Sequence, residues 1–514
     1  MSSLNVFGFK NVEELVGAIE RSFVTFANPL LATDVYKMGH MEQYAPGVTK
    51  VYSYLLARTD KEYRYTVFFG LQHYLATYLA RRLTPEMGEE FIANKRAILG
   101  LAEATQGSFV EAEEKVRALC RLGYIPLEIK AVPEGTVMPV RNVLATITNT
   151  LPEFYWCVGF FESLLLKVWD AITTASCSFT YRLIVEKYFN ETVEDSLNFF
   201  KDFMVHDFGY RGCASEESAT ITGAAHMLSF AGSDTVPARE YAIRMYKADQ
   251  TSLLMASVPA SEHSVMCSFS RGDELAAFRN MLQLYPTGIV SIVSDTYNIY
   301  TVLTDFAQEL KEEILARPEG SKAVFRPDSG NPEYIICGDP NARIDSKEWK
   351  GAVRLLEETF GSTVNAKGYK VLNAKVGLIY GEGMYLERYT RILERLKEMG
   401  YAACNLVIGV GGILRHHTRD TLGFALKATY VEIDGKPLEI EKDPITDKKK
   451  KSHKGLVALT KDATGEWTTL DRCTPEQEAA TLLEVVFRDG KVVNPPSFTE
   501  IKERVRQGRI KYAL

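Results

Sequence analysis

Short apolar runs recur between residues 200 and 430, and each run ends in an acidic or glycine-containing loop that precedes helical sequence. The runs cover Phe203 to His206, Ser291 to Val293, Ala323 to Phe325, Val376 to Tyr380 and Leu406 to Ile408. Strands that alternate with helices are usually parallel, and this number of units predicts an α/β barrel. The loops after the strands of such a barrel meet on one face, so we expect the functional residues there.

Residues 28–150 show the mixed pattern of an α+β unit. Its predicted elements are strands at Val51–Ala57 and Thr66–Leu71, a helix at Gln72–Arg82, and two or three strands within Glu128–Thr148. A long helical region from Leu151 to about Tyr188 follows. We expect four parts: an N-terminal extension (1–28), an α+β domain (29–165), an α/β barrel (166–430) and a C-terminal segment that packs on the α+β domain (431–514).

The composition narrows the classes of function. Of 514 residues, 46% are apolar and 25% are charged, and the formal net charge is −6. This negative balance argues against a general nucleic-acid binder and against a protein that binds anionic membranes. The most hydrophobic stretch, Phe154–Trp169, contains Glu162 and Lys167 and is too short to span a bilayer, which favours a buried helix.

The eight cysteines are spread singly along the chain, without a CxxC pair. This spacing suggests neither a zinc site nor a disulfide framework, and no residue is assigned as a metal ligand. Reduced thiols fit a cytoplasmic protein best.

The sequence HDFGYRG and the helix expected after it hold the first candidate site. Phe208, Arg211 and Asp234 lie on turns that flank a helix over Ala214–Leu228, for which Ser215 is a possible N-cap. A flat heterocycle with an amide suits this trio, because the ring offers a π-face, the guanidinium offers donors and the carboxylate accepts an N–H. Taken alone, the trio is equally well explained by a core phenylalanine and a surface arginine.

Loops after the later strands carry groups that suit a phosphorylated sugar. The Gly409–Gly412 turn can present backbone N–H groups to a phosphate if a helix begins directly after it, and Arg326 can bind a phosphate through two donors. Asp328 and Glu382 are carboxylates that can accept from ribose hydroxyls or hold magnesium through water. Neither GxGxxG nor GxxxxGK[ST] occurs, so a Rossmann site and a P-loop kinase are not supported.

His263 is a further candidate, in the sequence SEHS after an apolar run. A histidine beside a glutamate can act as a general base or as a nucleophile toward phosphate. The alternative is a core histidine whose ring nitrogens are satisfied by hydrogen bonds.

Taken together, these motifs resemble those of the nicotinamide phosphoribosyltransferase family of type II phosphoribosyltransferases. The resemblance runs through LLATDVYK, KVYSYLLAR, FFGLQHYL, HDFGYRG, GSDTV, SVPASEHS, VSDTYNIY, FRPDSGNP, GYKVL, GVGG and KDPITDKKKKSHKG. It implies an irregular α/β barrel and a homodimer with its sites at the subunit interface. The implied reaction joins nicotinamide to phosphoribosyl pyrophosphate, giving nicotinamide mononucleotide and pyrophosphate. The implied cofactors are magnesium and ATP, with ATP hydrolysis coupled through a phosphorylated histidine.

The resemblance also implies roles for single residues at the nicotinamide end. Phe208 and the partner subunit's Tyr36 would sandwich the ring. Arg211 and Asp234 would hold the carboxamide, and Asp34 would lie beside the ring.

At the phosphate end, the resemblance implies that His263 is the phosphorylated histidine and that Asp295 is a supporting acid of the same centre. Arg326 would meet the pyrophosphate or the ATP phosphates, and Asp328 the ribose hydroxyls. The other implied substrate contacts are Ser291, Gly381, Glu382, Gly411, Gly412, Arg419, Lys427 and the partner subunit's Arg58.

Two positions depart from the family pattern. Glu382 stands where the family usually has aspartate, which places the ribose contact at that position in doubt. The turn before Thr418-Arg419-Asp420 is about one residue shorter than the common form, which places the phosphate contact of Arg419 in doubt.

Three other functions stay open. Nicotinate phosphoribosyltransferases share the fold, and Asp234 argues for nicotinamide because a carboxylate accepts from an amide N–H but repels another carboxylate. A glycosidase or aldolase barrel would need paired carboxylates or a lysine at the strand ends. A non-catalytic binding protein on the same scaffold would not need the complete set of site residues.

Overall fold

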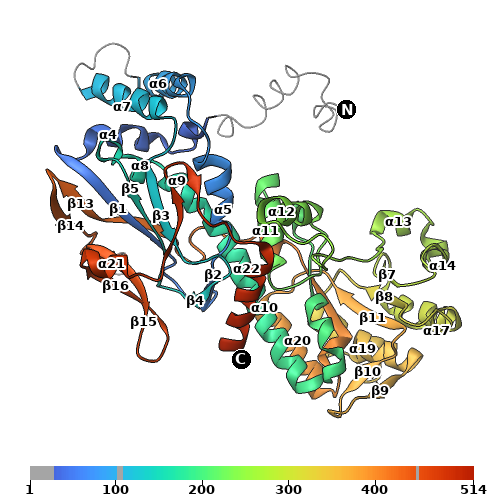
Figure 1. The fold of residues 1–514 in the computed structure, drawn as a ribbon. Helices are drawn as coiled ribbons and strands as arrows, with labels where there is room; N and C mark the ends of the chain where they lie inside the picture. Colours follow the sequence, from blue (N-terminus) through green and yellow to red (C-terminus); the bar gives the residue numbers. More distant parts are fainter. Residues whose placement is uncertain (1–27, 101–107, 447–450) are drawn as a thin grey trace. The chain divides into compact units, whose positions relative to one another are not determined.

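The computed structural model describes residues 28–100, 108–446 and 451–514, so the predicted extension lies outside the described residues except for residue 28. The chain divides into two compact units. Unit 1 comprises Met1–Thr173 and Thr418–Ser497, and unit 2 comprises Thr174–His417 and Phe498–Leu514. Figure 1 labels the elements of both units.

Unit 1 is built on a seven-stranded sheet with the strand order β14-β13-β1-β5-β3-β17-β18. Its central strand β1 (Val48–Leu56) pairs antiparallel with β13 (Ala425–Ile433) on one side and with β5 (Val143–Asn149) on the other. The other strands of the sheet are β3 (Leu127–Ala131), β14 (Lys436–Glu439), β17 (Glu484–Arg488) and β18 (Lys491–Val492). Helices α6 (Pro85–Leu99), α7 (Ser108–Leu122) and α8 (Cys157–Phe160) complete this part of the unit.

Unit 2 contains five parallel strands in the order β6-β12-β11-β8-β7. These strands are β6 (Val205–Asp207), β7 (Ile289–Val293), β8 (Lys322–Arg326), β11 (Val376–Tyr380) and β12 (Leu406–Val410). Single parallel bridges close the ring of strands between β6 and β7: Asp207 pairs with Ser233, Gly232 with Ala256, and Ala260 with Ser291. The result is a barrel that is irregular on one side, as expected.

Helices connect the parallel strands and cover the barrel (Figure 1). They include α11 (Glu216–His226), α12 (Val236–Tyr246), α14 (Glu274–Leu284), α19 (Lys347–Phe360) and α20 (Leu386–Glu398). The predicted helix after HDFGYRG is confirmed as α11, and the Ser215 side chain caps it by accepting a hydrogen bond from the Ser218 N–H at 3.2 Å. This cap satisfies one of the N–H groups that a helix start leaves unpaired.

The predicted strands of both units are confirmed, and two of them are shorter than predicted. The strand expected at Thr66–Leu71 is only β2 (Tyr65–Val67), because Gly70 takes a left-handed conformation (φ 95°) directly before α5 (Leu71–Tyr74). Phe203 ends a 3₁₀ helix, η6 (Asp195–Phe203), and does not belong to β6.

The first boundary between the units lies after Thr173, where residue 165 was predicted, and the division differs from the predicted domain bounds at two further places. The strand β13, which the predicted boundary at 430 divides, lies wholly in unit 1 because it pairs along its length with β1. The last helix, α22 (Phe498–Lys511), belongs to unit 2, where Phe498 packs against Tyr246 of α12. In the described parts of the chain, no helix combines the length and the hydrophobicity needed to cross a membrane.

Candidate functional site

The loop after β6 (residues 208–212, the β6 loop) positions Phe208 over two glycines. The Phe208 N–H donates to the Val410 carbonyl at 2.9 Å, which ties the loop to the end of β12. A Cβ atom at Gly409 would lie 2.1 Å from the Phe208 ring, and one at Gly381 would lie 3.5 Å from it. The ring therefore needs glycine at position 409, where any larger residue would displace it.

Asp234 lies beside this ring. Its Oδ1 accepts hydrogen bonds from His206 Nε2 at 3.1 Å and from the Ser257 hydroxyl, and its side chain is 47% exposed. Burial raises the pKa of Asp234, but hydrogen bonds from His206 and Ser257 and the charge of Arg326 outweigh it, so that the pKa is lowered. Asp234 is therefore a carboxylate at neutral pH, with one side open to a further donor.

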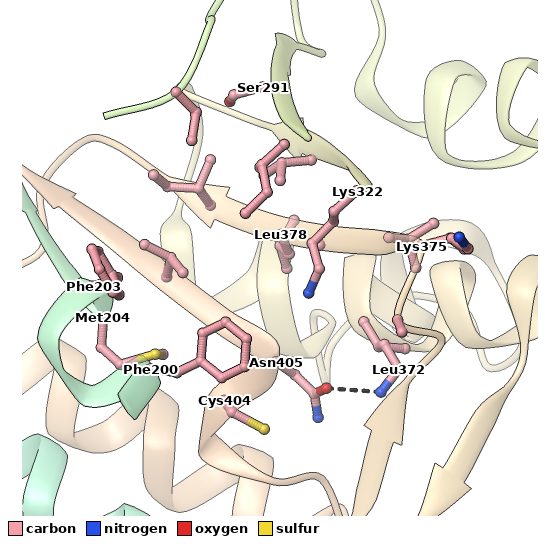
Figure 2. A pocket seen from close by; sticks show the side chains of 18 of the residues that line it. Phe200, Phe203, Met204, Ser291, Lys322, Leu372, Lys375, Leu378, Cys404 and Asn405 are labelled. Carbon is pink, nitrogen blue, oxygen red and sulfur yellow. Dashed lines mark hydrogen bonds between the residues drawn. The ribbon is translucent and has the colours of Figure 1, made fainter. Parts of the chain in front are cut away.

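Phe208, Asp234, Ser291 and Arg326 line one cavity of about 970 Å³ inside the barrel. The same cavity reaches residues at the opposite ends of the strands, which include Phe200, Met204, Lys322 and Cys404 (Figure 2). The cavity thus runs along the barrel, and Phe208, Asp234 and Arg326 open on it together.

Arg211 and Glu382 do not belong to this cavity. Arg211 lies on the 3₁₀ helix η7 (Tyr210–Gly212) of the β6 loop and is exposed. Glu382 is exposed in the loop after β11. Both residues lie in the loops that the sequence predicted for them, but neither is among the residues that line this cavity.

His263 is close to Asp295, as the sequence predicted. His263 begins the short helix α13 (His263–Cys267), its side chain is 47% exposed, and its Nε2 lies 3.8 Å from Asp295 Oδ1. Its Nδ1 is hydrogen-bonded to the Thr296 hydroxyl at 3.2 Å. The alternative of a buried core histidine is wrong, because half of this side chain faces solvent.

Asp295 is also linked to the loop after β8. The side chain is 3% exposed, and its Oδ2 accepts from the Asp328 N–H at 3.0 Å and from the Ser329 hydroxyl at 2.5 Å. Its Oδ1 is buried and has no hydrogen-bond partner among the described residues. Arg326 lies two residues before Asp328 at the end of β8, and its Nη2 donates to the Ser261 carbonyl at 3.1 Å.

Glycines at the ends of β11 and β12 allow Asp328 and the β6 loop to lie close to the backbone there. A Cβ atom at Gly381 would lie 2.7 Å from Asp328 Oδ1, so the carboxylate reaches the backbone of the neighbouring loop only because Gly381 has no side chain. The glycine turn (residues 409–412) begins within the end of β12 and leads into a single 3₁₀ turn, η11 (Gly412–Leu414). The helix that a phosphate site would need directly after the turn is therefore only this one 3₁₀ turn.

The predicted phosphate residues of unit 1 form a positively charged cluster. Arg58 follows β1 and donates from Nε to the Gly423 carbonyl at 2.8 Å, and Lys427 lies on the neighbouring strand β13. Burial lowers the pKa of Lys427, and the charges of Lys442, Arg58 and Lys37 lower it further, while Glu162 opposes them. An excess of neighbouring cations is the environment in which an anion binds favourably.

Arg419, Asp34 and Tyr36 also lie in unit 1. Arg419 is half exposed and pairs with its neighbour Asp420 at 2.7 Å. Asp34 accepts a hydrogen bond from the Ser163 hydroxyl, and the Tyr36 side chain is 61% exposed. The exposed part of the Tyr36 ring offers apolar area on which another ring can stack.

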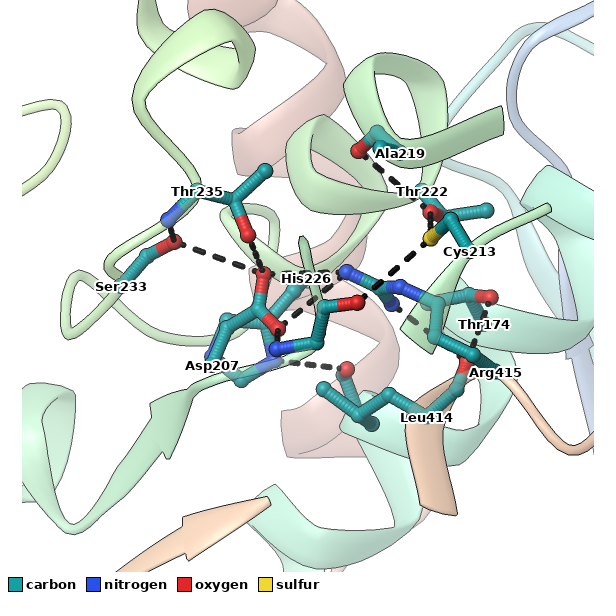
Figure 3. Close-up of polar contacts among 12 residues, drawn as sticks. Thr174, Asp207, Cys213, Ala219, Thr222, His226, Ser233, Thr235, Leu414 and Arg415 are labelled. Carbon is teal, nitrogen blue, oxygen red and sulfur yellow. Dashed lines mark hydrogen bonds and ion pairs between the residues drawn. The ribbon is translucent and has the colours of Figure 1, made fainter. Parts of the chain in front are cut away.

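Sequence reasoning missed a buried ion pair next to the β6 loop. Arg415 Nη2 donates to Asp207 Oδ2 at 3.0 Å and to Oδ1 at 3.2 Å, and the side chains are 2% and 0% exposed (Figure 3). It also missed His206 as a partner of Asp234. The available signals were weak: the aspartate directly before Phe208, and an arginine within an otherwise apolar turn.

Comparisons with known proteins assign the chain to a family. The model of the Nicotinate phosphoribosyltransferase (NAPRTase) family matches residues 203–491, and that of the Nicotinamide phosphoribosyltransferase, N-terminal domain, matches residues 28–95. The fold is shared with nicotinate-nucleotide pyrophosphorylase from Pyrococcus furiosus (TM-score 0.57, 16% identity, covering 96% of this chain and 99% of that one). It is also shared with human Nicotinic Acid Phosphoribosyltransferase (TM-score 0.51, 16% identity, covering 93% and 94%).

Two bacterial relatives are much more similar in sequence. Nicotinamide phosphoribosyltransferase of Acinetobacter baylyi is 39% identical over 500 residues, which cover 93% of this chain and 97% of the relative. Nicotinamide phosphoribosyltransferase of Xanthomonas campestris pv. campestris is 37% identical over 492 residues, which cover 94% and 99%. Such identity over nearly the whole length, together with the matched family models, shows that this chain belongs to the nicotinamide phosphoribosyltransferase family.

Proposed function

We propose that this protein transfers the 5-phosphoribosyl group of phosphoribosyl pyrophosphate to nicotinamide, giving nicotinamide mononucleotide and pyrophosphate for NAD salvage. The observation that carries this proposal is the cavity on which Phe208, Asp234 and Arg326 open together. The three side chains supply a π-face for the pyridine ring, an acceptor for the carboxamide N–H and donors for pyrophosphate. The names of the relatives support the same reaction.

The proposed chemistry needs little beyond positioning and charge. Departure of pyrophosphate leaves positive charge on the ribose, and the pyridine nitrogen attacks C1 with a lone pair that carries no proton. No general base is therefore required for the ring. Arg326 stabilises the negative charge that develops on the leaving pyrophosphate, and the Phe208 ring holds the nicotinamide nitrogen in line with the bond that breaks.

We propose that magnesium enters this site with the pyrophosphate group and neutralises part of its charge. Among the described residues, no three histidine, cysteine, aspartate or glutamate side chains converge on a possible metal site. Magnesium commonly binds through one or two carboxylates, water and substrate phosphates, so a full protein cage is not needed. Asp295 Oδ1 fits such a role, because it is buried and has no hydrogen-bond partner among the described residues.

We further propose that ATP donates its terminal phosphate to His263. The ring is accessible: a ring nitrogen with a free lone pair would attack the γ-phosphorus of ATP while the bond from that phosphorus to the bridging oxygen breaks and ADP leaves, and the Asp295 carboxylate beside Nε2 would orient the ring. A phosphate on His263 would add negative charge close to Arg326 and Asp328, where it can recruit magnesium and strengthen substrate binding.

Product analysis tests the proposed reaction. The protein is mixed with phosphoribosyl pyrophosphate, magnesium and either nicotinamide or nicotinate, and the mononucleotide products are measured by mass. We expect kcat/KM for nicotinamide to exceed that for nicotinate by at least ~100-fold, because Asp234 repels a second carboxylate. Asp234→Asn should weaken this preference. Equal kcat/KM for the two substrates in the unmutated protein would favour the alternative, a nicotinate phosphoribosyltransferase.

We also propose that the active unit is a cytoplasmic homodimer with two shared sites, in which the partner subunit's Tyr36 and the partner subunit's Arg58 complete each site. The exposed Tyr36 ring and the cationic surroundings of Lys427 support this arrangement. A Tyr36→Ala protein and a Phe208→Ala protein, each inactive, should regain part of the activity when mixed, since one site of a heterodimer is intact. A fully active monomer would rule the arrangement out.

A further inference from the structure

The β6 loop and the glycine turn meet around the ion pair of Asp207 and Arg415. Asp207 is the last residue of β6, and Arg415 follows the 3₁₀ turn after the glycine turn. The two residues are 208 positions apart in sequence, and Arg415 Nη2 contacts both carboxylate oxygens. Burial raises the pKa of Asp207, but the Arg415 charge, His226 and hydrogen bonds from Thr235 and Gly209 outweigh it, so the pKa is lowered.

Asp207 is held by donors from three segments. Oδ1 accepts from the Gly209 N–H at 2.7 Å, and Oδ2 accepts from the Thr235 hydroxyl at 2.8 Å and from the Ser233 hydroxyl at 3.4 Å (Figure 3). With the two contacts from Arg415, both oxygens have more than one donor. A buried carboxylate with these partners has little freedom to move.

The backbone around Arg415 is also fixed by hydrogen bonds. Its backbone N–H donates to the Gly412 carbonyl at 2.8 Å, and the Thr174 hydroxyl donates to the Leu414 carbonyl at 3.2 Å. Its guanidinium packs on Gly209, where a Cβ atom would lie 2.9 Å from both Cζ and Nε. The pair therefore joins the backbone of the glycine turn to the backbone of the β6 loop.

We propose that Arg415 is a positioning residue that sets the distance between the β6 loop and the glycine turn. This inference rests on the proposed function, in which Phe208 of the β6 loop holds nicotinamide and Gly411 and Gly412 meet the 5′-phosphate of the other substrate. Arg415 is buried against Asp207, with 2% of its side chain exposed, and it does not line the cavity. Bond formation needs the ring nitrogen and the ribose carbon at a fixed separation, and two glycine-rich loops require an external constraint to keep it.

Steady-state kinetics of Arg415→Met and Arg415→Lys tests this role. We expect Arg415→Met to lower kcat/KM by about 10- to 100-fold, the cost of a misplacement of roughly 1 Å, and to raise KM for both substrates. Arg415→Lys keeps one charged contact with Asp207 and should recover part of the loss. Gly209→Ala adds a methyl group against the same guanidinium without removing a charge and should give the same kinetic pattern more weakly.

Arg182→Met is the matched control. Arg182 is also a buried arginine of unit 2, 7% exposed, and it pairs with Glu186 at 2.9 Å and with Asp202 at 2.5 Å, which belong to neither loop. This variant should lose thermal stability while both KM values stay unchanged.

The outcomes separate the two proposals. Unchanged KM values in folded Arg415→Met or Gly209→Ala, or the same KM increase in Arg182→Met, would overturn the positioning role. If Arg415→Met does not fold, Arg415→Lys and Gly209→Ala decide. Failure of the proposed function would instead show as an unmutated protein that forms no mononucleotide.

Discussion

Two aspartates at the ends of barrel strands, Asp207 and Asp295, differ in how completely their oxygens are occupied. Both side chains are almost fully buried, 0% and 3% exposed. Both oxygens of Asp207 accept hydrogen bonds, and Arg415 adds an ion pair. For Asp295 only Oδ2 accepts hydrogen bonds, from the Asp328 N–H and the Ser329 hydroxyl, while Oδ1 faces His263 without one.

The comparison shows that burial alone does not tell a structural carboxylate from a reactive one. A buried polar oxygen without a partner costs free energy, so its retention calls for an explanation. Asp207 has no capacity left for a ligand and holds two loops together. Asp295 has one oxygen left for the His263 ring or for a hydrated cation, so we expect ATP hydrolysis to suffer when Asp295 is changed, and stability to suffer more when Asp207 is changed.

The largest expected effect is on ATP hydrolysis, in variants of Asp295 and of His263. Asp295→Asn should lower the rate of ATP hydrolysis by at least ~100-fold, because it removes the charge that orients and supports His263. If the proposed ATP coupling holds, His263→Ala should abolish ATP hydrolysis and any decrease in apparent KM on addition of ATP, while a basal transferase rate remains. Rates of ADP release and of mononucleotide formation, with and without ATP, measure both effects.

Asp207→Asn is the control for this experiment, because Asp207 is as buried as Asp295 but pairs with Arg415 instead of facing His263. ATP-dependent activation that persists in folded His263→Ala protein would reject the phosphohistidine. An acid-labile phosphate on the unmutated protein that disappears in His263→Ala would sharpen the assignment.

The second expected effect is on stability. Here Asp207→Asn should have the larger effect and Asp295→Asn the smaller one, the reverse of the order expected for ATP hydrolysis. Asp207→Asn leaves the Arg415 guanidinium buried without its counter-ion and should lower the free energy of unfolding by about 3–5 kcal/mol. Asp295→Asn keeps an oxygen for the Asp328 N–H and should cost less than about 1 kcal/mol. Urea denaturation of both variants measures the difference, and equal losses would contradict the distinction drawn here.

The smallest effect concerns pH, through His226 next to the Asp207 pair. Its Nδ1 lies 2.9 Å from the Ser178 hydroxyl and its Nε2 lies 3.2 Å from the Gly232 carbonyl. Burial lowers the pKa of His226 to about 4; the Asp207 carboxylate opposes this, and the Arg415 and His206 charges add to it. In the unfolded chain the pKa is about 6.5, so between these values the unfolded state binds one more proton.

The free energy of unfolding should therefore fall with decreasing pH between about 6.5 and 4, by roughly 1.4 kcal/mol per pH unit. His226→Gln should flatten this slope, whatever its effect at pH 7. Because the pKa of Asp207 is lowered, the stabilisation that its carboxylate provides is lost only below pH ~4, outside the pH range in which His226 titrates. A variant with the slope of the unmutated protein would show that His226 is not the group that titrates.

Sequence patterns located the strands and several polar side chains at their ends, because both leave local signals. Apolar runs followed by polar loops marked β7, β8, β11 and β12, and the residues at or just after the ends of these strands include Arg326, Asp328 and Gly381. The partners of these residues leave no such signal. Arg415 meets Asp207 across 208 positions, and His206 meets Asp234 across 28, so only the closed ring of strands brings them together.

The long cavity has a thermodynamic consequence for ligand binding. Besides Phe208, its wall includes Phe200, Phe203, Met204 and Leu378 (Figure 2), so much of the wall is carbon and holds water weakly. Transfer of an aromatic ring into such a poorly hydrated space is commonly driven by enthalpy near room temperature and carries a negative heat-capacity change. The enthalpy of nicotinamide binding should therefore become more favourable on warming, even where the affinity changes little.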